Sequence, residues 1–219
     1  MPNESLARVT SRQAAARLAE RDPVIAGLVR EFGLPRMPVS KSTPLAELVR
    51  GITYQQIGGA AAGAIHRRLL AAIGDDFTPQ RLLELDDATL RAVGLSGGKV
   101  ASIRDLAAKV ADGTVIVSPR RLARRTDDEI IAELTRVRGI GPWSAQMFLI
   151  LQMRRPDVWP TGDLAVRKGF GLGWGIPTPT PKELELLAEP YRPYRTTVAW
   201  YCWQVAERRI GASAPIPLP

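Results

Sequence analysis

A glycine hairpin at residues 139–141 and an aspartate at position 163 combine residue types and spacing that could do chemistry. In Gly139-Ile140-Gly141-Pro142, the glycines let an anion approach the backbone closely, and Pro142 suits the first turn of a following helix. The N–H groups and the dipole at a helix N-terminus favour a negative charge. The hairpin is therefore consistent with two interpretations, a phosphate-binding turn or a plain connection between two helices.

Asp163 lies in a sequence typical of a helix N-cap. It follows Gly162 and precedes Leu164, and Arg167 stands four residues further on as a possible ionic partner. A capping carboxylate is held rigidly and stays ionised, so it could also stabilise a cation that forms in front of it. The cap and the catalytic acid are thus compatible roles.

The charge of the chain favours a polyanionic partner. Thirty Lys and Arg residues stand against 22 Asp and Glu residues, which gives a net charge of +8 and a pI near 10.2. The cations are spread along the chain, so any basic face must be assembled by folding. Together with the hairpin, this charge makes nucleic acid the expected partner.

Single cysteine and histidine residues exclude several classes of site. One cysteine, Cys202, excludes an intramolecular disulfide and every multi-cysteine zinc or iron–sulfur site. His66 falls in a helical pattern beside Arg67 and Arg68, and we expect it to be solvated and without a role. The sequence contains no apolar run of about 18 residues, the length that predicts a membrane span. We therefore expect no membrane partner and an intracellular location beside nucleic acid.

Hydrophobic residues recur with a period of 3.6, which predicts an all-α fold of about ten helices or slightly more. Thr43 is an expected N-cap, and Thr126 or Asp127 is expected to cap the helix that ends at Leu134. The only β-like stretch, Thr114–Val117, is too short to build a sheet. The expected helices cover residues 12–21, 24–32, 44–52, 60–73, 79–85, 87–93, 99–111, 127–134, 144–153, 164–170, 183–189 and 194–209, and a loop is expected from Gly171 to Pro181.

Aromatic residues are concentrated after the hairpin. On the last expected helix, Tyr201 and Trp203 are two positions apart, roughly 200° around the axis. They should therefore face opposite ways, one toward the core and one toward a cleft, where an aromatic ring could stack on a flat base. Core packing is the alternative for most of these rings.

Several motifs together resemble the helix–hairpin–helix DNA glycosylase superfamily, and specifically its 3-methyladenine (AlkA-type) branch. The resemblance runs from about Thr43 to Trp203. The motifs are Ile-Thr-Tyr-Gln-Gln-Ile at 52–57, the segment 90–99, Arg-Gly-Ile-Gly-Pro-Trp-Ser-Ala at 138–145, Pro-Thr-Gly-Asp at 160–163 and Tyr-Arg-Pro-Tyr-Arg at 191–195.

The resemblance implies two helical subdomains with an active-site cleft between them. The first would span residues 43–165 and contain the helix–hairpin–helix motif at 126–153, and the second would combine residues 1–42 with 166–219. Such enzymes bend duplex DNA, flip a damaged nucleotide into the cleft and hydrolyse its N-glycosidic bond, with Asp163 as the catalytic carboxylate. An N-alkylated purine is already cationic and leaves without a general acid, so one carboxylate could suffice.

The same resemblance assigns the other site residues. Trp143, Trp203 and Met147 would line the base pocket, although Met147 replaces a tyrosine of some relatives. Lyase relatives carry a lysine in place of Trp143, so no lyase activity is expected. The expected DNA contacts are Gln55, Gln56, Gly139, Ile140, Gly141 and Ser144, and carbonyls of Thr135, Val137 and Ile140 would hold a structural Na⁺ or K⁺, the only expected cofactor.

The expected function is a monofunctional alkylpurine DNA glycosylase that initiates base-excision repair. The expected partner is double-stranded DNA with damaged bases, bound by a monomer, in the bacterial cytoplasm at the nucleoid or in a eukaryotic nucleus. Two alternatives are a lesion-binding protein without catalysis and a glycosylase for other modified or mismatched bases.

Overall fold

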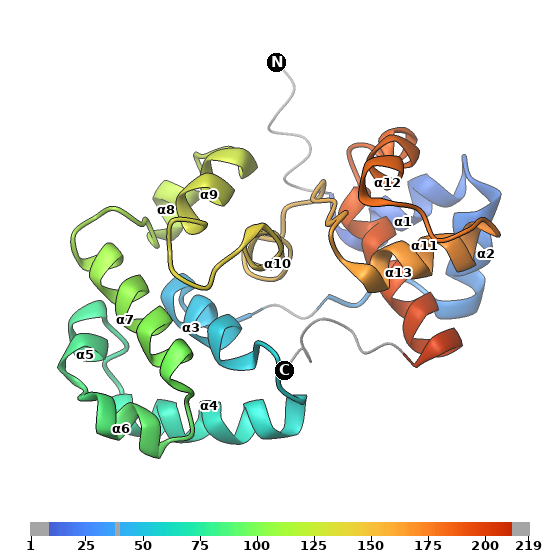
Figure 1. Cartoon of the computed structure of the whole chain (residues 1–219). Coiled ribbons are helices and arrows are strands. Elements are labelled where there is room, and N and C mark those ends of the chain that lie inside the picture. The colour runs from blue at the N-terminus through green and yellow to red at the C-terminus, as the bar shows by residue number, and fades with distance from the viewer. Residues whose placement is uncertain (1–8, 38–39, 212–219) are drawn as a thin grey trace. The chain divides into compact units, whose positions relative to one another are not determined.

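The computed structural model describes residues 9–37 and 40–211, and these residues are helical or irregular, with no β-strand among them. They form two compact units (Figure 1). Among the described residues, one unit combines residues 9–37 with 149–211, and the other spans 40–148. The all-α prediction is confirmed.

Several helices of the 40–148 unit begin at side-chain caps. Thr43 caps α3, which Pro44 opens, and Thr126 forms a capping box with Glu129 at the start of α9, as the sequence predicts. The long helix α7 packs against α3, α5 and α6. The helices of this unit are α3 (Pro44–Tyr54), α4 (Gly59–Ile73), α5 (Pro79–Glu84), α6 (Asp87–Ala92), α7 (Gly97–Ala111), α8 (Pro119–Leu122), α9 (Asp127–Leu134) and most of α10 (Pro142–Leu151).

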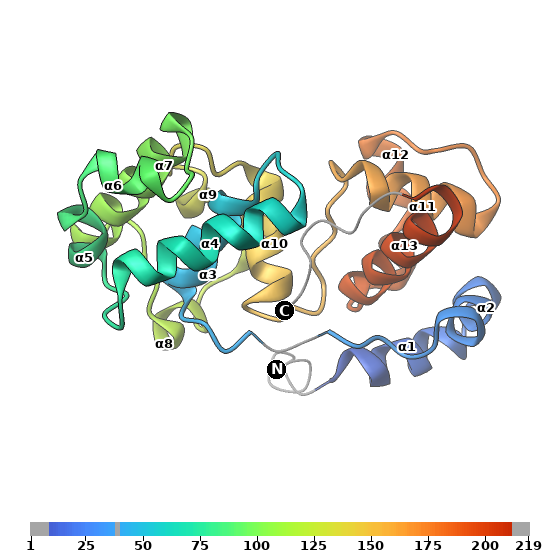
Figure 2. The same cartoon turned by 90° about the horizontal axis from the view of Figure 1, so that it is seen from below.

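The unit formed by both ends of the chain is organised around two helices. The most extensive packing in this unit is between α11 and α13, which lie side by side (Figure 2). The helices of this unit are α1 (Ser11–Ala19), α2 (Pro23–Phe32), α11 (Leu164–Trp174), α12 (Pro181–Leu187), the 3₁₀ turn η2 (Glu189–Tyr191) and α13 (Arg195–Ile210).

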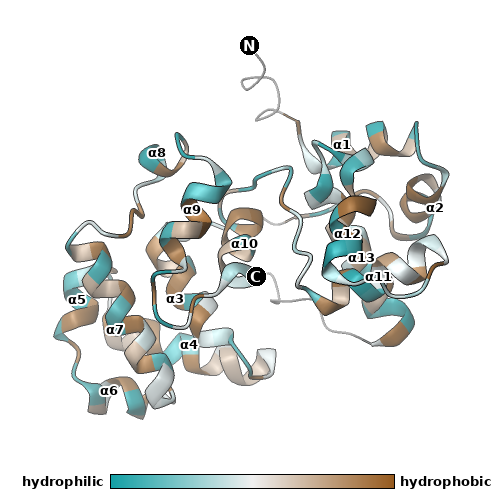
Figure 3. Cartoon of the chain, turned by 45° about the horizontal axis from the view of Figure 1, so that its top comes forward, coloured by the Kyte–Doolittle hydropathy of each residue, from teal (hydrophilic) through white to brown (hydrophobic). Residues whose placement is uncertain are grey.

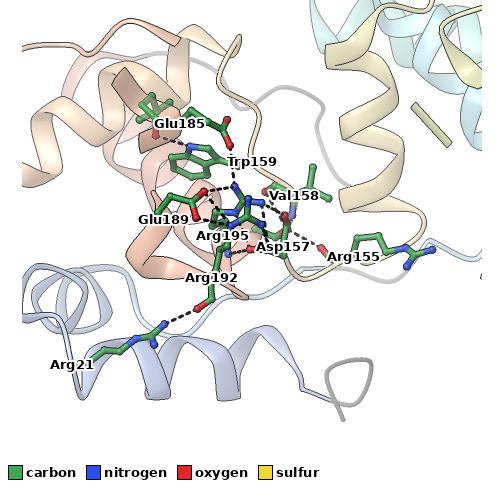
Figure 4. A network of polar contacts seen from close by, with 11 residues as sticks. Arg21, Arg155, Asp157, Val158, Trp159, Glu185, Glu189, Arg192 and Arg195 are labelled. Atoms are coloured by element: carbon green, nitrogen blue, oxygen red, sulfur yellow. Dashed lines mark hydrogen bonds and ion pairs between the residues drawn. The ribbon is translucent and has the colours of Figure 1, made fainter. Parts of the chain in front are cut away.

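Residues 149–165 lie in the unit with the chain termini, whereas the sequence assigned them to the other domain. Figure 4 shows the polar network that holds this segment. The buried guanidinium of Arg195 forms a two-point ion pair with Asp157, with distances of 2.9 and 3.0 Å. The hydroxyl of Thr196 donates to the Arg155 carbonyl at 2.7 Å and accepts the N–H of Val158 at 2.9 Å. These bonds to Arg195 and Thr196 attach the segment to the first turn of α13 and so place it in the same unit as α13.

Most predicted helices differ from the observed ones by only a few residues at their ends. Helix α11 continues to Trp174, beyond the predicted loop start at Gly171, and the short helix α8 was not predicted. Thr114–Val117 is not a strand, because no neighbouring strand is available for it to pair with in the described residues. Within these residues no helix has the length and apolar character that a membrane span requires.

Helix α10, which follows the hairpin, is the most apolar of the helices. Figure 3 shows most of its ribbon in hydrophobic or neutral colours. Five of its residues, Ala145, Met147, Phe148, Leu149 and Ile150, are buried.

Candidate functional site

The hairpin between α9 and α10 has the backbone geometry that the sequence predicts. Gly139 adopts φ +76°, and Ile140 points inward with 5% of its surface exposed. A Cβ atom on Gly139 would lie 2.6 Å from the hydroxyl oxygen of Ser102, so glycine is needed here for space as well as for conformation. Gly139 and Gly141 are both exposed.

Two of the hairpin N–H groups are used inside the protein. The N–H of Arg138 donates to the carboxylate of Asp105 at 2.7 Å, and the N–H of Ile140 donates to the Val137 carbonyl at 3.1 Å. In the part of the chain that the structure describes, the N–H groups of Gly139 and Gly141 have no acceptor. These two exposed donors at the start of a helix are suited to a phosphate.

The carbonyl oxygens predicted to hold a cation lie in the same turn. Thr135 is the C-cap of α9, and the Val137 carbonyl already accepts the N–H of Ile140. A carbonyl oxygen has two lone pairs, so this bond leaves one for a cation. A Na⁺ or K⁺ ion bound by Thr135, Val137 and Ile140 stays a prediction.

Asp163 is the N-cap of α11, and its carboxylate accepts hydrogen bonds at both oxygens. Its Oδ1 atom accepts the N–H groups of Ala165 at 2.8 Å and Val166 at 3.0 Å, and its Oδ2 atom accepts the indole N–H of Trp203 at 3.4 Å. The side chain is 6% exposed. These bonds fix the orientation of the carboxylate.

Cys202 lies near Asp163 in the structure, and Arg167 lies near it in the sequence. Burial raises the pKa of the Cys202 thiol, and the negative charge of Asp163 raises it further, so this thiol stays neutral. Arg167, which the sequence offered as an ionic partner of Asp163, directs its Nε to the Pro179 carbonyl at 2.7 Å.

Tyr201 and Trp203 are both buried, at 0% and 5% exposure. The expectation that only one of them joins the interior is therefore wrong, because α13 is covered on more than one side. Three other aromatic side chains form a core cluster: Phe170 stacks on Trp174 at 4.1 Å between ring centroids, and Trp159 meets Phe170 edge to face.

The residues predicted for the base pocket are divided between the units. Trp143, which is partly exposed, and Met147, which is buried, lie four residues apart on α10 in the 40–148 unit. Trp203 lies beside Asp163 in the other unit. A pocket that joins these side chains remains a prediction.

The predicted DNA-contacting glutamines differ in their surroundings. Gln56 is exposed, whereas the side-chain amide of Gln55 donates to the carbonyl of Gly139 at 2.9 Å and to the hydroxyl of Ser144 at 3.3 Å. Ser144 is partly buried. The structure thus gives Gln55 contacts within the protein.

His66 is not the solvated residue that the sequence predicted. It is half-buried and lies edge to face with Tyr54, the last residue of α3, at 6.1 Å between ring centroids. Burial lowers the pKa of His66, and the nearby Arg50 guanidinium lowers it further.

Sequence reasoning did not identify the residues that support the site. Asp105, Ser102 and Lys99 lie on α7, and the first two contact the hairpin. Lys99 donates to the carbonyl of Thr53 at 2.6 Å. The one sequence signal for the supporting role of α7 was the position of Lys99 at the end of the 90–99 motif.

The chain is basic and all-α, and it combines a helix–hairpin–helix that has free glycine N–H groups with a carboxylate held in place by hydrogen bonds. These features define the class of helix–hairpin–helix DNA-binding proteins. Residues 49–193, more than half of the chain, match the model of the HhH-GPD superfamily of base excision DNA repair proteins. The chain belongs to this superfamily.

Individual relatives agree with this assignment. DNA-3-methyladenine glycosylase 1 of Schizosaccharomyces pombe is 32% identical over 176 residues, which cover 79% of this chain and 77% of the relative. DNA-3-methyladenine glycosylase 2 of Escherichia coli is 27% identical over 165 residues, 71% of this chain and 55% of that protein.

Solved structures show the same fold. The structure of the S. pombe 3-methyladenine DNA glycosylase in complex with abasic DNA superimposes with a TM-score of 0.79 at 29% identity, and the match covers 92% of this chain and 100% of that one. The family resemblance inferred from the sequence is confirmed.

Proposed function

We propose that this protein is a 3-methyladenine DNA glycosylase that starts base excision repair by hydrolysing the N-glycosidic bond of alkylated purines. The observation that carries the proposal is the Asp163 carboxylate, fixed at a helix N-terminus by two backbone N–H groups and the Trp203 indole. Family membership and the relatives from S. pombe and E. coli supply the substrate class.

The chemistry follows from the charges. When the bond between C1′ and the purine nitrogen breaks, the bonding electrons leave with the base, and positive charge develops on the sugar. An ionised carboxylate that faces the sugar stabilises this charge and accepts a proton from the attacking water. The water oxygen bonds to C1′, and the products are a free base and an abasic site.

An N3-alkylated adenine carries its positive charge before the reaction. Bond cleavage neutralises this base, so it leaves without being protonated, and one carboxylate is enough. Trp143 stands where lyase relatives carry a lysine nucleophile, so we infer hydrolysis without strand cleavage by that route.

DNA binding is supported by the hairpin and by the DNA complex of the S. pombe relative. The free N–H groups of Gly139 and Gly141 would hold a phosphate of duplex DNA, and the exposed Gln56 would enter the space left by a flipped base. We propose that the protein binds as a monomer.

The test is Asp163→Asn with methylated duplex DNA as substrate. Asparagine keeps an oxygen that can cap the helix but removes the negative charge, so release of free N3-methyladenine should fall by at least about 100-fold, the order expected when a charged catalytic group is removed. Binding to a duplex with an abasic-site analogue should persist.

Release at the parent rate by Asp163→Asn would refute the assigned role of the carboxylate. A parent protein that binds lesions tightly but frees no base from any of N3-methyladenine, N7-methylguanine, hypoxanthine or ethenoadenine duplexes would be a lesion-binding protein instead. Strand scission by the parent, scored on a denaturing gel, would contradict the absence of lyase activity.

A further inference from the structure

The turn between α3 and α4, residues 55–58, is held in an unusual conformation within the 40–148 unit. Gln56 adopts φ +58°, one of two non-glycine residues with a positive φ in the described chain, and its side chain is exposed. Ile57 beside it is 38% exposed. A left-handed conformation at a residue other than glycine persists only where neighbouring contacts hold it.

One of these contacts is made by Gln55. Its side-chain amide has two N–H donors, and the amide nitrogen lies 2.9 Å from the Gly139 carbonyl and 3.3 Å from the Ser144 hydroxyl oxygen. The first acceptor belongs to the hairpin and the second to the first turn of α10. The side chain therefore connects the 55–58 turn directly to the hairpin, 84 residues along the chain.

A second contact comes from α7. The ammonium of Lys99 donates to the carbonyl of Thr53 at 2.6 Å, near the C-terminal end of α3, where a cation is favoured. The same helix supports the hairpin, because Ser102 lies under Gly139 and Asp105 accepts the N–H of Arg138. The turn and the hairpin thus rest on one helix and are joined to each other by Gln55.

We propose that Gln55 is a positioning residue that fixes the exposed tip of the turn, Gln56 and Ile57, at a set distance from the phosphate-binding glycines. This inference rests on the proposed function, because it concerns how the protein opens a DNA duplex. Phosphate binding by the hairpin and insertion of the tip then occur as one event, and little ordering of the turn is left to the moment of binding. Gln55 acts through the hairpin and not by touching DNA.

The test compares Gln55→Ala with the matched control Gln56→Ala. In the free protein, Gln55→Ala should speed amide hydrogen exchange at Arg138 and Ile140 about fivefold, the change expected when one hydrogen bond is removed. Gln56→Ala should leave this exchange unchanged. A thermal unfolding midpoint close to that of the parent shows that both variants are folded.

DNA binding gives the second measurement, with a duplex that carries an abasic-site analogue beside a 2-aminopurine. Both variants should reduce the rise in 2-aminopurine fluorescence that reports unstacking. Only Gln55→Ala should also flatten the dependence of log affinity on log salt, by about 0.9 for each phosphate that the variant no longer neutralises.

Parent-like hairpin exchange and a parent-like salt slope in Gln55→Ala would overturn the proposal. Gln56→Ala changing hairpin exchange and salt slope as much as Gln55→Ala does would overturn it too. Neither measurement uses catalysis. A parent protein that releases no base would therefore refute the proposed function without affecting the outcome for Gln55.

Discussion

Gly169→Ala should separate α11, which Asp163 caps, from α13, which carries Trp203. A Cβ atom at this position would lie 1.9 Å from the carbonyl oxygen, 2.5 Å from the carbonyl carbon and 2.8 Å from the Cα of Cys202. All three are backbone atoms of α13, so no side-chain rotation can relieve the overlap. An ordinary carbon–oxygen contact requires α11 and α13 to move apart by about 1.5 Å.

The expected cost follows from this movement. Overpacking a core costs about 1–3 kcal/mol, and a backbone clash across the main helix pair of the unit should reach the upper end, about 3 kcal/mol. For a chain of this size, that corresponds to a fall of roughly 6–12 °C in the unfolding midpoint. The same separation lengthens the 3.4 Å hydrogen bond between Trp203 and Asp163 beyond bonding distance, so base release should fall as well.

Gly173→Ala is the matched control on the same helix. A Cβ atom there meets its nearest neighbours, in Leu28 and Val205, at 3.9 and 4.0 Å, which are ordinary contacts. Alanine is favoured over glycine within a helix by about 1 kcal/mol, so this variant should be as stable as the parent or more so. Urea and thermal unfolding of both variants, with base release measured at about 25 °C, test the argument. A change below about 0.5 kcal/mol in Gly169→Ala, or an equal destabilisation of both variants, would refute it.

Further predictions concern single contacts. Trp203→Phe keeps an aromatic ring but removes the N–H group whose hydrogen bond Asp163 accepts. The rate of base release, measured in a single turnover at saturating enzyme, should therefore fall about fivefold. An unchanged rate would show that this hydrogen bond does not position the carboxylate. Asp157→Asn removes the charge that pairs with the buried Arg195 at two points, so the free energy of unfolding, measured with urea, should fall by about 3 kcal/mol. A fall below about 1 kcal/mol would contradict the importance of this ion pair. The pKa of His66 is lowered in the folded protein, so near pH 6.5 the unfolded chain binds more protons than the folded one, and stability falls as the pH drops through about 6.5. His66→Phe should lose this part of the pH dependence of unfolding between about pH 7.5 and 5.5. A pH profile identical to that of the parent would disprove the contribution of His66.

Local features of the fold were predictable from the sequence because their causes lie within a few residues. Thr43, Thr126 and Asp163 each bond to N–H groups two or three positions ahead, so the cap and the start of the helix are encoded together. The hairpin was predictable for the same reason, since Gly139 supplies a positive φ and Ile140 an apolar anchor.

Contacts between distant parts of the chain were beyond the reach of the sequence pattern. The glycines of the 164–174 segment suggested an early helix end, because glycine is a poor helix former, yet α11 continues to Trp174. Packing against α13 decides this, since Gly169 allows the two backbones to approach closely. The positions of Tyr201 and Trp203 around the helix axis also gave a wrong expectation, since both side chains are buried. Helical periodicity distinguishes one buried face from one exposed face, and it cannot show that a helix is covered on several sides.

The sequence by itself determined the helical class, the glycine hairpin, the capping aspartate and the family, since each depends on residue types at short, fixed spacings. Only the tertiary structure showed that Trp203 donates to Asp163 and that Gln55 connects its turn to Gly139, across 40 and 84 residues. The physical reason is that packing of whole helices sets such distances, and a hydrogen bond forms only where that packing brings donor and acceptor within about 3.5 Å.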